Sequence, residues 1–464
     1  MNLKELLSSY QKEALENLQS WIRINSIYDE NTVSKGKPFG EGVYQALEFI
    51  ARLAEEKGFE VDRCDGYCTE IKYGRGDKII GVYAHADVVP VSGNWKYPPF
   101  SATLENDVLY GRGTSDDKGP AIAAFYALLA LKENNLIKDD YQVRLVIGGN
   151  EERGSACLEY YFHKLHKPYC NYGFTPDGEF PLIYGEKGIS NYQTKGHITL
   201  EDIIYIDAGV VANSVIDKAE ALLKTKEGIE EYLASVGYKY LLEDKAEGYL
   251  LTIFGKAAHG SLPQEGINAG LQLLDVLGEV FNIDEFKVIV ASYKDPSGKT
   301  LNEYYHSDLL NDTTYNVGLI NYRDNNFSMV VNFRYGENVD PLKVINSINN
   351  KLPFETTVIT ATESLCFDPS SSWIQSLLKA YQEESGDYES KIMTIGGGTY
   401  AKECKNTVAF GSAFPGSHDN IHDADEHIEL KDFYTSMPIY ARAILALGEE
   451  KWEWNTSLGV SHIY

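Results

Sequence analysis

Three short apolar segments in the first part of the chain each end in side chains that can bind a metal ion or a proton. They are KIIGVYAH (78–85), YQVRLVIGGNEE (141–152) and YGFTPDG (172–178). Their length and their content of Ile, Val and aromatic residues predict buried strands. Helical segments are expected between and around them, at 44–57, 121–135 and 155–166. Strands that alternate with helices predict an α/β domain with a mostly parallel sheet.

The middle of the chain has a different pattern. Short alternating strands are expected at 189–196, 249–259, 313–324 and 326–335, with helices near 214–236, 266–281 and 340–351. The last hundred residues return to the first style, with helices expected at 371–385 and 430–448. We therefore expect an α+β domain at 186–366, inserted into a discontinuous α/β domain formed by 1–185 and 367–464.

Charge and composition exclude several classes of partner. The formal net charge is −26, from 42 basic and 68 acidic residues, which argues against nucleic acid or an anionic membrane surface. No apolar run is as long as a membrane span, and the charged amphipathic N-terminus lacks the apolar core of a signal peptide. The six cysteines are scattered without a zinc-knuckle spacing, which is typical of reduced thiols and predicts a cytoplasmic protein.

The candidate ligands are expected to meet at one edge of the sheet, because active sites of open α/β sheets lie beyond the carboxyl ends of the strands. Two further segments carry such side chains: the loop GRGTSDDKGP (111–120) and the late segment GSHDNIHDADEHI (416–428). Histidines together with carboxylates suit zinc, manganese or cobalt. A carboxylate can bridge two such ions roughly 3.5–4 Å apart. The candidates are His85, Asp87, Asp116, Asp117, Glu151, Glu152, Asp177, His418, His422, Asp423, Asp425, Glu426 and His427.

Spacing suggests roles for some of these residues. In a strand, positions i and i+2 share a face, so His85 can bind an ion while Asp87 holds its other ring nitrogen. Of the adjacent pair Glu151 and Glu152, one can bind metal while the other accepts a proton from water. Each feature also has a structural interpretation: a hydrogen-bonded histidine, a solvated Glu-Glu loop, or an Asp-Asp helix cap.

Other chemistries find little support. Gly111 and Gly113 suggest a dinucleotide-binding loop, but Asp116 stands where the third glycine is needed. The chain contains neither the G-x-S-x-G pattern of serine hydrolases nor the P-loop pattern of nucleotide-binding proteins.

Six sequence blocks follow one another in a fixed order: HADVVP (85–90), GRGTSDDKG (111–119), GGNEE (148–152), PDGEFP (176–181), GKAAHGSLPQEGINA (255–269) and HDADE (422–426). This order resembles that of the M20 metallopeptidase family, and within it the bacterial dipeptidases similar to PepV. The resemblance covers essentially the whole chain. It implies that His85 and Asp177 bind one ion, that Glu152 and His422 bind the other, and that Asp116 bridges them. Asp87 would support His85, and Glu151 would be the general base. His418, four residues before His422, is a competing candidate ligand.

The same resemblance makes residues 186–366 a lid that supplies substrate contacts. His259 would polarise the scissile carbonyl, with Asn213 assisting it, and Arg334 would bind the substrate carboxylate. The loop of Gly396, Gly397, Gly398 and Thr399 would offer backbone N–H groups. Alternatives are a structural His259, a helix cap at Asn213 and a surface salt bridge at Arg334.

The resemblance implies a monomeric, metal-dependent dipeptidase that binds two divalent ions, zinc first, with manganese or cobalt as alternatives. Its partner would be a small peptide with a free C-terminus. An N-acyl amino acid amidase of the same family is the alternative enzyme. A protein that binds metal or peptide without catalysis is a third possibility, against which an intact Glu151 argues.

Overall fold

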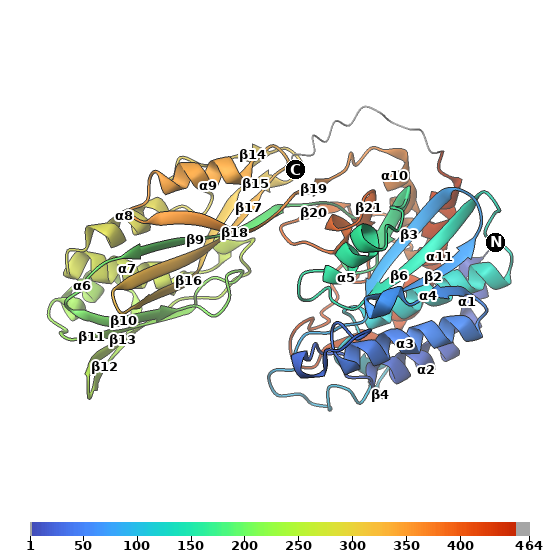
Figure 1. Cartoon of the computed structure of the whole chain (residues 1–464), viewed down its shortest axis with the longest axis horizontal. Coiled ribbons are helices and arrows are strands. Elements are labelled where there is room, and N and C mark those ends of the chain that lie inside the picture. The colour runs from blue at the N-terminus through green and yellow to red at the C-terminus, as the bar shows by residue number, and fades with distance from the viewer. Residues whose placement is uncertain (1, 452–464) are drawn as a thin grey trace. The chain divides into compact units, whose positions relative to one another are not determined.

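The computed structural model describes residues 2–451, which form two compact units (Figure 1). Unit 1 comprises the chain up to Tyr184, the segment Phe367–Met393 and the chain from Thr399 onward. Unit 2 comprises Gly185–Cys366 together with Thr394–Gly398. Each unit is described by itself.

Most of a nine-stranded sheet forms the framework of unit 1, and its last strands include residues assigned to unit 2. Its order is β1 (Glu60–Asp62), β2 (Cys68–Gly74), β6 (Tyr141–Gly148), β3 (Lys78–His85), β7 (Tyr172–Thr175), β21 (Thr407–Ala409), β8 (Ile183–Glu186) and β19 (Leu365–Cys366), with β20 (Met393–Ile395) paired to β8. The four strands β6, β3, β7 and β21 are mutually parallel, and their neighbours pair antiparallel. Parallel strands covered on both faces are continuously apolar, as in β3, where seven of eight residues are buried. The predicted α/β fold is confirmed, but the sheet is mixed: its four central strands are parallel and the outer strands are antiparallel.

Helices cover this sheet. They are α1 (Leu3–Ser8), α2 (Gln11–Ile22), α3 (Glu41–Glu56), α4 (Lys118–Glu133), α5 (Ala156–Glu159), α10 (Ser372–Ser385) and α11 (Leu430–Glu449), with a π-helical turn at Tyr160–Lys164 and short 3₁₀ turns at Glu30–Thr32, Cys64–Gly66 and Tyr400–Lys402. Helix α4 is apolar all round, as a fully enclosed helix must be. It contacts α2 and α11 as well as β3 and β6, so its first residues are held rigidly.

A small three-stranded sheet joins two loops that are far apart in sequence. It has the order β22 (His427–Glu429), β5 (Val108–Tyr110) and β4 (Thr103–Glu105). His427 pairs with Tyr110, so the segment that ends at 426 lies beside the loop that begins at Gly111.

Unit 2 is built on an eight-stranded antiparallel sheet. Its order is β12 (Lys239–Lys245), β13 (Gly248–Phe254), β11 (Lys218–Leu223), β10 (Ile203–Ala208), β16 (Thr314–Arg323), β17 (Asn326–Tyr335), β9 (Gly188–His197) and β18 (Glu355–Thr362). The remaining elements are α6 (Ile229–Val236), α7 (Ala269–Val280), α8 (Asp284–Ser292), α9 (Pro341–Asn349), a 3₁₀ turn at Pro263–Glu265 and the hairpin β14 (His306–Ser307) and β15 (Asn311–Asp312). Helix α7 packs on β11, β13 and β16, giving an α+β unit with its own apolar core.

The helix expected at 214–236 is wrong in its first half. Residues Lys218–Leu223 form strand β11, and only Ile229–Val236 is helical. The sequence KAEALL is rich in good helix formers. Pairing with β10 on one side and β13 on the other outweighs that local preference, as tertiary context commonly does for strands.

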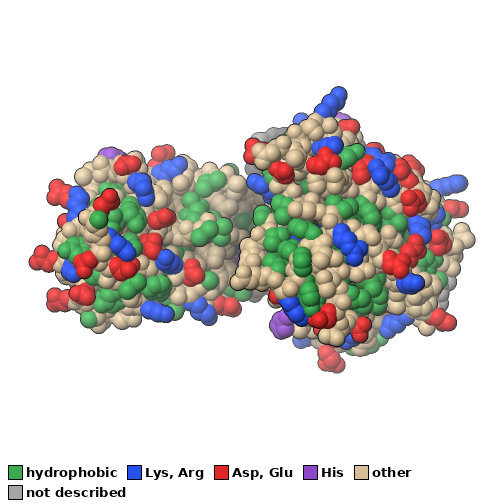
Figure 2. All heavy atoms as spheres, turned by 90° about the horizontal axis from the view of Figure 1, so that it is seen from below, with side chains coloured by type: hydrophobic (Ala, Val, Ile, Leu, Met, Phe, Trp, Pro, Cys, Tyr) green, Lys and Arg blue, Asp and Glu red, His purple; other side chains and the backbone are tan. Residues whose placement is uncertain are grey.

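The charged side chains on the face drawn in Figure 2 are dispersed rather than gathered. On the face seen in Figure 2, acidic side chains are scattered over both units and interspersed with Lys and Arg. None of the helices within residues 2–451 combines the length and the apolar character needed to span a bilayer.

Candidate metal centre

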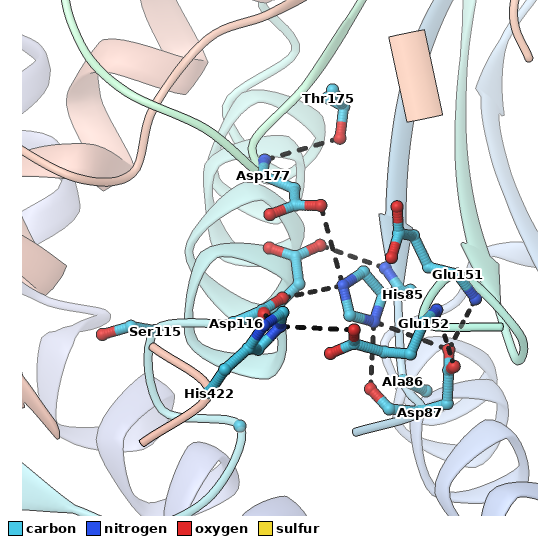
Figure 3. A network of polar contacts seen from close by, with 12 residues as sticks. His85, Ala86, Asp87, Ser115, Asp116, Glu151, Glu152, Thr175, Asp177 and His422 are labelled. Atoms are coloured by element: carbon cyan, nitrogen blue, oxygen red, sulfur yellow. Dashed lines mark hydrogen bonds and ion pairs between the residues drawn. The ribbon is translucent and has the colours of Figure 1, made fainter. Parts of the chain in front are cut away.

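The carboxyl ends of three neighbouring parallel strands bring the candidate ligands of unit 1 together. His85 is the last residue of β3 and lies in register with Gly148, the last residue of β6. Two residues separate the end of β6 from the pair Glu151 and Glu152, and one residue separates the end of β7 from Asp177. Asp116 comes from the loop before α4, and His422 from the loop before β22. Figure 3 shows these side chains converging on one place.

Asp116 lies between the two histidines. Its Oδ1 is 2.9 Å from Nε2 of His85, and its Oδ2 is 2.9 Å from Nε2 of His422. His422 Nε2 is also 3.3 Å from Glu152 Oε2, and His85 Nε2 is 3.7 Å from Asp177 Oδ2. One carboxylate with a separate imidazole on each oxygen is the arrangement that a bridging ligand needs.

The donor atoms form two overlapping groups. Those of His85, Asp116 and Glu152 lie within 4.8 Å of one another, and so do those of His85, Glu151 and Asp177. Imidazole nitrogens and carboxylate oxygens are the donors that zinc, manganese and cobalt accept. The residues present therefore fit two adjacent divalent ions.

The protonation of His85 also points to a cation at this place. Its Nδ1 lies 2.9 Å from the main-chain oxygen of Asp87, and because a carbonyl only accepts, Nδ1 must carry a proton. In the neutral ring, Nε2 then presents a lone pair to Asp116 Oδ1. Two lone pairs at 2.9 Å repel each other, so the contact needs either a second ring proton or a metal ion.

The pKa values of the residues at the centre are shifted by burial and by the close approach of several carboxylates. Burial, reinforced by the charge of Asp116, raises the pKa of Asp177 to about 7. Burial, together with the charges of Asp177 and Glu152, raises the pKa of Glu151 well above its usual value. Hydrogen bonds to Asp116 and Glu152 raise the pKa of His422 to about 11. The centre contains several buried carboxylates but few positively charged groups to balance them. Bound divalent cations would supply the missing positive charge.

Asp87 supports the centre differently from the sequence-based expectation. Its main-chain oxygen, not its carboxylate, makes the closer contact with His85, since the nearest carboxylate oxygen is 3.5 Å from Nδ1. The carboxylate instead accepts hydrogen bonds from the backbone N–H groups of Glu151 at 3.0 Å and Glu152 at 3.2 Å. Asp87 thus fixes both the ring of His85 and the backbone of the glutamate pair.

His418 and His422 are distinguished by position. His422 makes the contacts with Asp116 and Glu152 given above. Both histidines are exposed, but among the described residues the ring of His418 takes part in none of the contacts that join the candidate ligands.

Arg112, to which the sequence assigned no role, forms a buried ion pair with Glu426 beside the centre. Glu426 was a candidate ligand, but its carboxylate binds Arg112 and backbone N–H groups instead. Glu426 stood in the acidic run HDADE, and Arg112 in the glycine loop. Their pairing becomes evident only in the structure, where both lie next to the small sheet that contains β5 and β22.

Unit 2 carries most of the other candidate residues, among them Arg334 on β17. The Arg334 side chain is 3% exposed; its Nε donates to Asn332 Oδ1 at 2.6 Å, and its Nη1 donates to the main-chain oxygen of Gly396 at 2.5 Å. Gly397 and Gly398 continue this loop, and Thr399 caps the 3₁₀ turn that follows. The charge of Arg334, after burial, lowers the pKa of His259.

Asn213 is placed beside His259 by the backbone. Its main-chain oxygen accepts the N–H of Gly260 at 2.7 Å, and Ser214 and His259 form an isolated bridge. Strand β11, not a helix, follows Asn213, so the helix-cap alternative for this residue is wrong.

One family model and two relatives match most of this chain. The model of peptidase family M20/M25/M40 matches residues 81–446. A Bacillus subtilis (strain 168) protein named "Putative dipeptidase YtjP" is 34% identical over 97% of this chain and 100% of its own length. A Staphylococcus haemolyticus protein named "Putative dipeptidase SH1171" is 33% identical over 96% of this chain and 99% of its own.

Solved structures share the fold at low sequence identity. An M20 family metallo-carboxypeptidase from Sulfolobus solfataricus matches with a TM-score of 0.58 at 19% identity, covering 94% of this chain and 99% of its own. The dipeptidase Dug1p from Saccharomyces cerevisiae matches with a TM-score of 0.58 at 15% identity, covering 97% and 98%.

Proposed function

The chain belongs to the M20/M25/M40 peptidase family and is a hydrolase that acts on peptides, and from this premise we propose that its substrates are dipeptides with a free C-terminal carboxylate. Relatives named as dipeptidases match the chain over nearly their entire lengths, which supports the short substrate. One observation in unit 2 supports the proposal that the substrate has a free C-terminal carboxylate.

That observation is the buried guanidinium of Arg334. Within residues 2–451 no carboxylate forms an ion pair with it, and both hydrogen bonds given above go to neutral oxygens. Burial lowers the pKa of Arg334 only to about 10, so the side chain is charged at neutral pH. A buried charge without a counter-charge is costly. A substrate carboxylate, bound through the planar fork, would supply the missing anion.

We assign the metal ligands as the contacts suggest. His85 and Asp177 would hold one ion, Glu152 and His422 the other, and Asp116 would bridge them. Zinc is the first choice for this donor set, with manganese or cobalt as alternatives. When bound, a pair of such ions supplies a water of lowered pKa and withdraws electron density from the scissile carbonyl.

Glu151 is the residue we assign as general base. Its backbone is fixed by Asp87, and among the described contacts its carboxylate has neither a hydrogen bond nor an ion pair, unlike that of Glu152. A raised pKa lets a carboxylate take a proton from the attacking water and return it to the departing amine.

His259 is suited to donate a hydrogen bond to the oxyanion. The backbone N–H of Ser261 lies 3.3 Å from His259 Nδ1, and the Ser261 hydroxyl oxygen lies 2.6 Å from the same atom. Because a backbone N–H can only donate, Nδ1 is the acceptor and the proton of the neutral ring is on Nε2. A lowered pKa keeps the ring neutral, so Nε2–H would be the donor offered to developing negative charge.

We further propose that the enzyme acts as a monomer, with unit 2 as the lid that supplies His259 and Arg334 from the same chain. A cytoplasmic location fits the unpaired thiols of Cys64, Cys68, Cys157, Cys170 and Cys404. The amidase alternative is not favoured, since the relatives are named as dipeptidases.

Arg334→Ala is expected to raise the KM of a neutral dipeptide and lower its kcat/KM by about 10- to 100-fold, because hydrogen bonds to a charged group contribute roughly 1.5–3 kcal/mol each. The same dipeptide with a C-terminal amide should be a poor substrate of the parent enzyme, and the substitution should hardly change its turnover. Steady-state kinetics with both substrates measures this difference.

Arg323→Ala is the matched control, because Arg323 is an exposed arginine on the neighbouring strand β16 that stacks over Tyr205. It should leave both substrates unaffected. An Arg334→Ala enzyme with the parental KM for the free dipeptide would show that the carboxylate binds elsewhere.

A further inference from the structure

Two loops that carry proposed metal ligands are tied together by a buried ion pair. Arg112 lies in the loop that leads to Asp116, and Glu426 lies four residues after His422. Their side chains are each 1% exposed, and Arg112 Nη1 donates to Glu426 Oε2 at 2.7 Å. The backbone reinforces the connection, since the N–H of Gly111 donates to the main-chain oxygen of Glu426 at 2.9 Å.

The other carboxylate oxygen of Glu426 holds the backbone of the Asp116 loop. Glu426 Oε1 accepts the N–H groups of Gly113 at 3.0 Å, Ser115 at 3.0 Å and Asp116 at 3.2 Å. Three backbone donors aimed at one anionic oxygen fix the path of the chain through these residues. The last donor belongs to Asp116 itself, so Glu426 holds the residue that lies between the two histidines.

Arg112 reaches the other ligand loop. Its Nη2 donates to the main-chain oxygen of His422 at 3.3 Å, while its guanidinium stacks over the ring of Trp95, with the centroid 5.1 Å away. The ion pair therefore contacts the backbone of Asp116 through Glu426 and the backbone of His422 through Arg112. These are the two residues whose side chains meet at 2.9 Å in the candidate centre.

A buried ion pair by itself is weak evidence for stability, because desolvation of both charges offsets their attraction. Here each partner also makes charge-assisted hydrogen bonds to the backbone of a ligand loop. Groups that hold metal ligands in place commonly change metal affinity or activity about 10- to 100-fold when they are altered.

The geometry points to Arg112 and Glu426 as positioning residues that set the separation of Asp116 and His422, and so the affinity for the ion that these two ligands share. Neither residue would touch substrate or metal. The inference rests on the metal centre of the proposed function but not on the choice of dipeptide substrates.

The test uses Glu426→Gln. The amide keeps the shape of the side chain and one acceptor oxygen, but it leaves Arg112 without a counter-charge. The metal-free protein is titrated with Co²⁺, and binding is followed by visible absorption and calorimetry. The parent should bind two ions per chain. Glu426→Gln should bind one of them about 10- to 100-fold more weakly. At saturating Co²⁺, kcat should fall while the KM of the dipeptide, which Arg334 would set, stays unchanged.

Glu384→Gln is the matched control. Glu384 is 3% exposed and pairs with Arg442, but it joins α10 to α11. Arg442 lines a cavity with Tyr141 and Tyr172, which begin β6 and β7, so the pair lies at the opposite end of the sheet from the candidate centre. Glu384→Gln should bind both ions with parental affinity. Equal weakening in Glu384→Gln and Glu426→Gln would reveal a general effect of losing a buried charge and would overturn the inference.

Arg112→Lys decides the matter if Glu426→Gln does not fold. Lysine keeps a positive charge beside Glu426 but lacks the fork that also reaches His422, so weaker binding of one ion is expected. If folded Arg112→Lys binds both ions with parental affinity, the positioning role is overturned, but the metal centre is not. Fewer than two ions in the parent would instead overturn the metal centre itself.

Discussion

Glu151→Gln is expected to lower kcat for dipeptide hydrolysis by about 10²- to 10⁴-fold, the usual contribution of a general base, while the protein still binds two ions. The amide has nearly the same shape as the carboxylate but cannot take a proton from water. The backbone at this position is held by Asp87, so the substitution should leave the surrounding centre in place. Steady-state kinetics and metal analysis of the purified variant measure the two effects.

Glu152→Gln is the informative comparison, because it makes the same chemical change one residue away. Glu152 Oε2 lies 3.3 Å from His422 Nε2 and is a proposed ligand. This variant should lose metal as well as activity. Substantial turnover by Glu151→Gln, or loss of metal equal to that of Glu152→Gln, would rule out the assignment of Glu151 as the base.

Asp116→Asn should weaken metal binding more than about 100-fold, exceeding the effect typical of residues that only support a ligand. Both carboxylate oxygens of Asp116 face a histidine at 2.9 Å. Asparagine offers one oxygen, and its NH₂ group cannot bind a cation. Neither ion would then keep its full set of donors, and hydrolysis should fall to background. Metal content after dialysis, together with activity at increasing metal concentrations, tests this expectation.

The control for this substitution is Asp275→Asn. Asp275 lies on α7 of unit 2, where its carboxylate accepts hydrogen bonds from Tyr232 and Tyr238. Its replacement should leave metal content and kcat as in the parent. If Asp116→Asn retains two tightly bound ions, Asp116 is not the bridging ligand.

Much of the centre follows from sequence because its residues stand at strand ends. The apolar runs that end at His85 and lead to Glu151 and Asp177 can be recognised as strands from the sequence alone. Parallel strands bring their carboxyl ends to one edge of the sheet. The ordered motifs identified the family, which the family match confirms. In both cases the signal is local, a few residues long and fixed to one element.

Features that depend on partners far away in the chain cannot be predicted from the local sequence. Strand β11 carries helix-forming residues and becomes a strand only because β10 and β13 pair with it. The contact of Arg112 with Glu426 joins residues 314 positions apart, and no sequence period links them. The sequence predicts that the carboxylate of Asp87 contacts the ring of His85, two residues away. In the structure it accepts hydrogen bonds from the backbone of Glu151 and Glu152, which are 64 and 65 positions further along the chain.

Hydrolysis through two metal ions is tested most directly by titrating the metal-free enzyme with Zn²⁺, Mn²⁺ or Co²⁺ while measuring both bound ions and turnover of a neutral dipeptide. The expected result is no turnover without metal and full turnover only when two ions are bound per chain. Full turnover by the metal-free protein, or with a single bound ion, would contradict the two-ion mechanism.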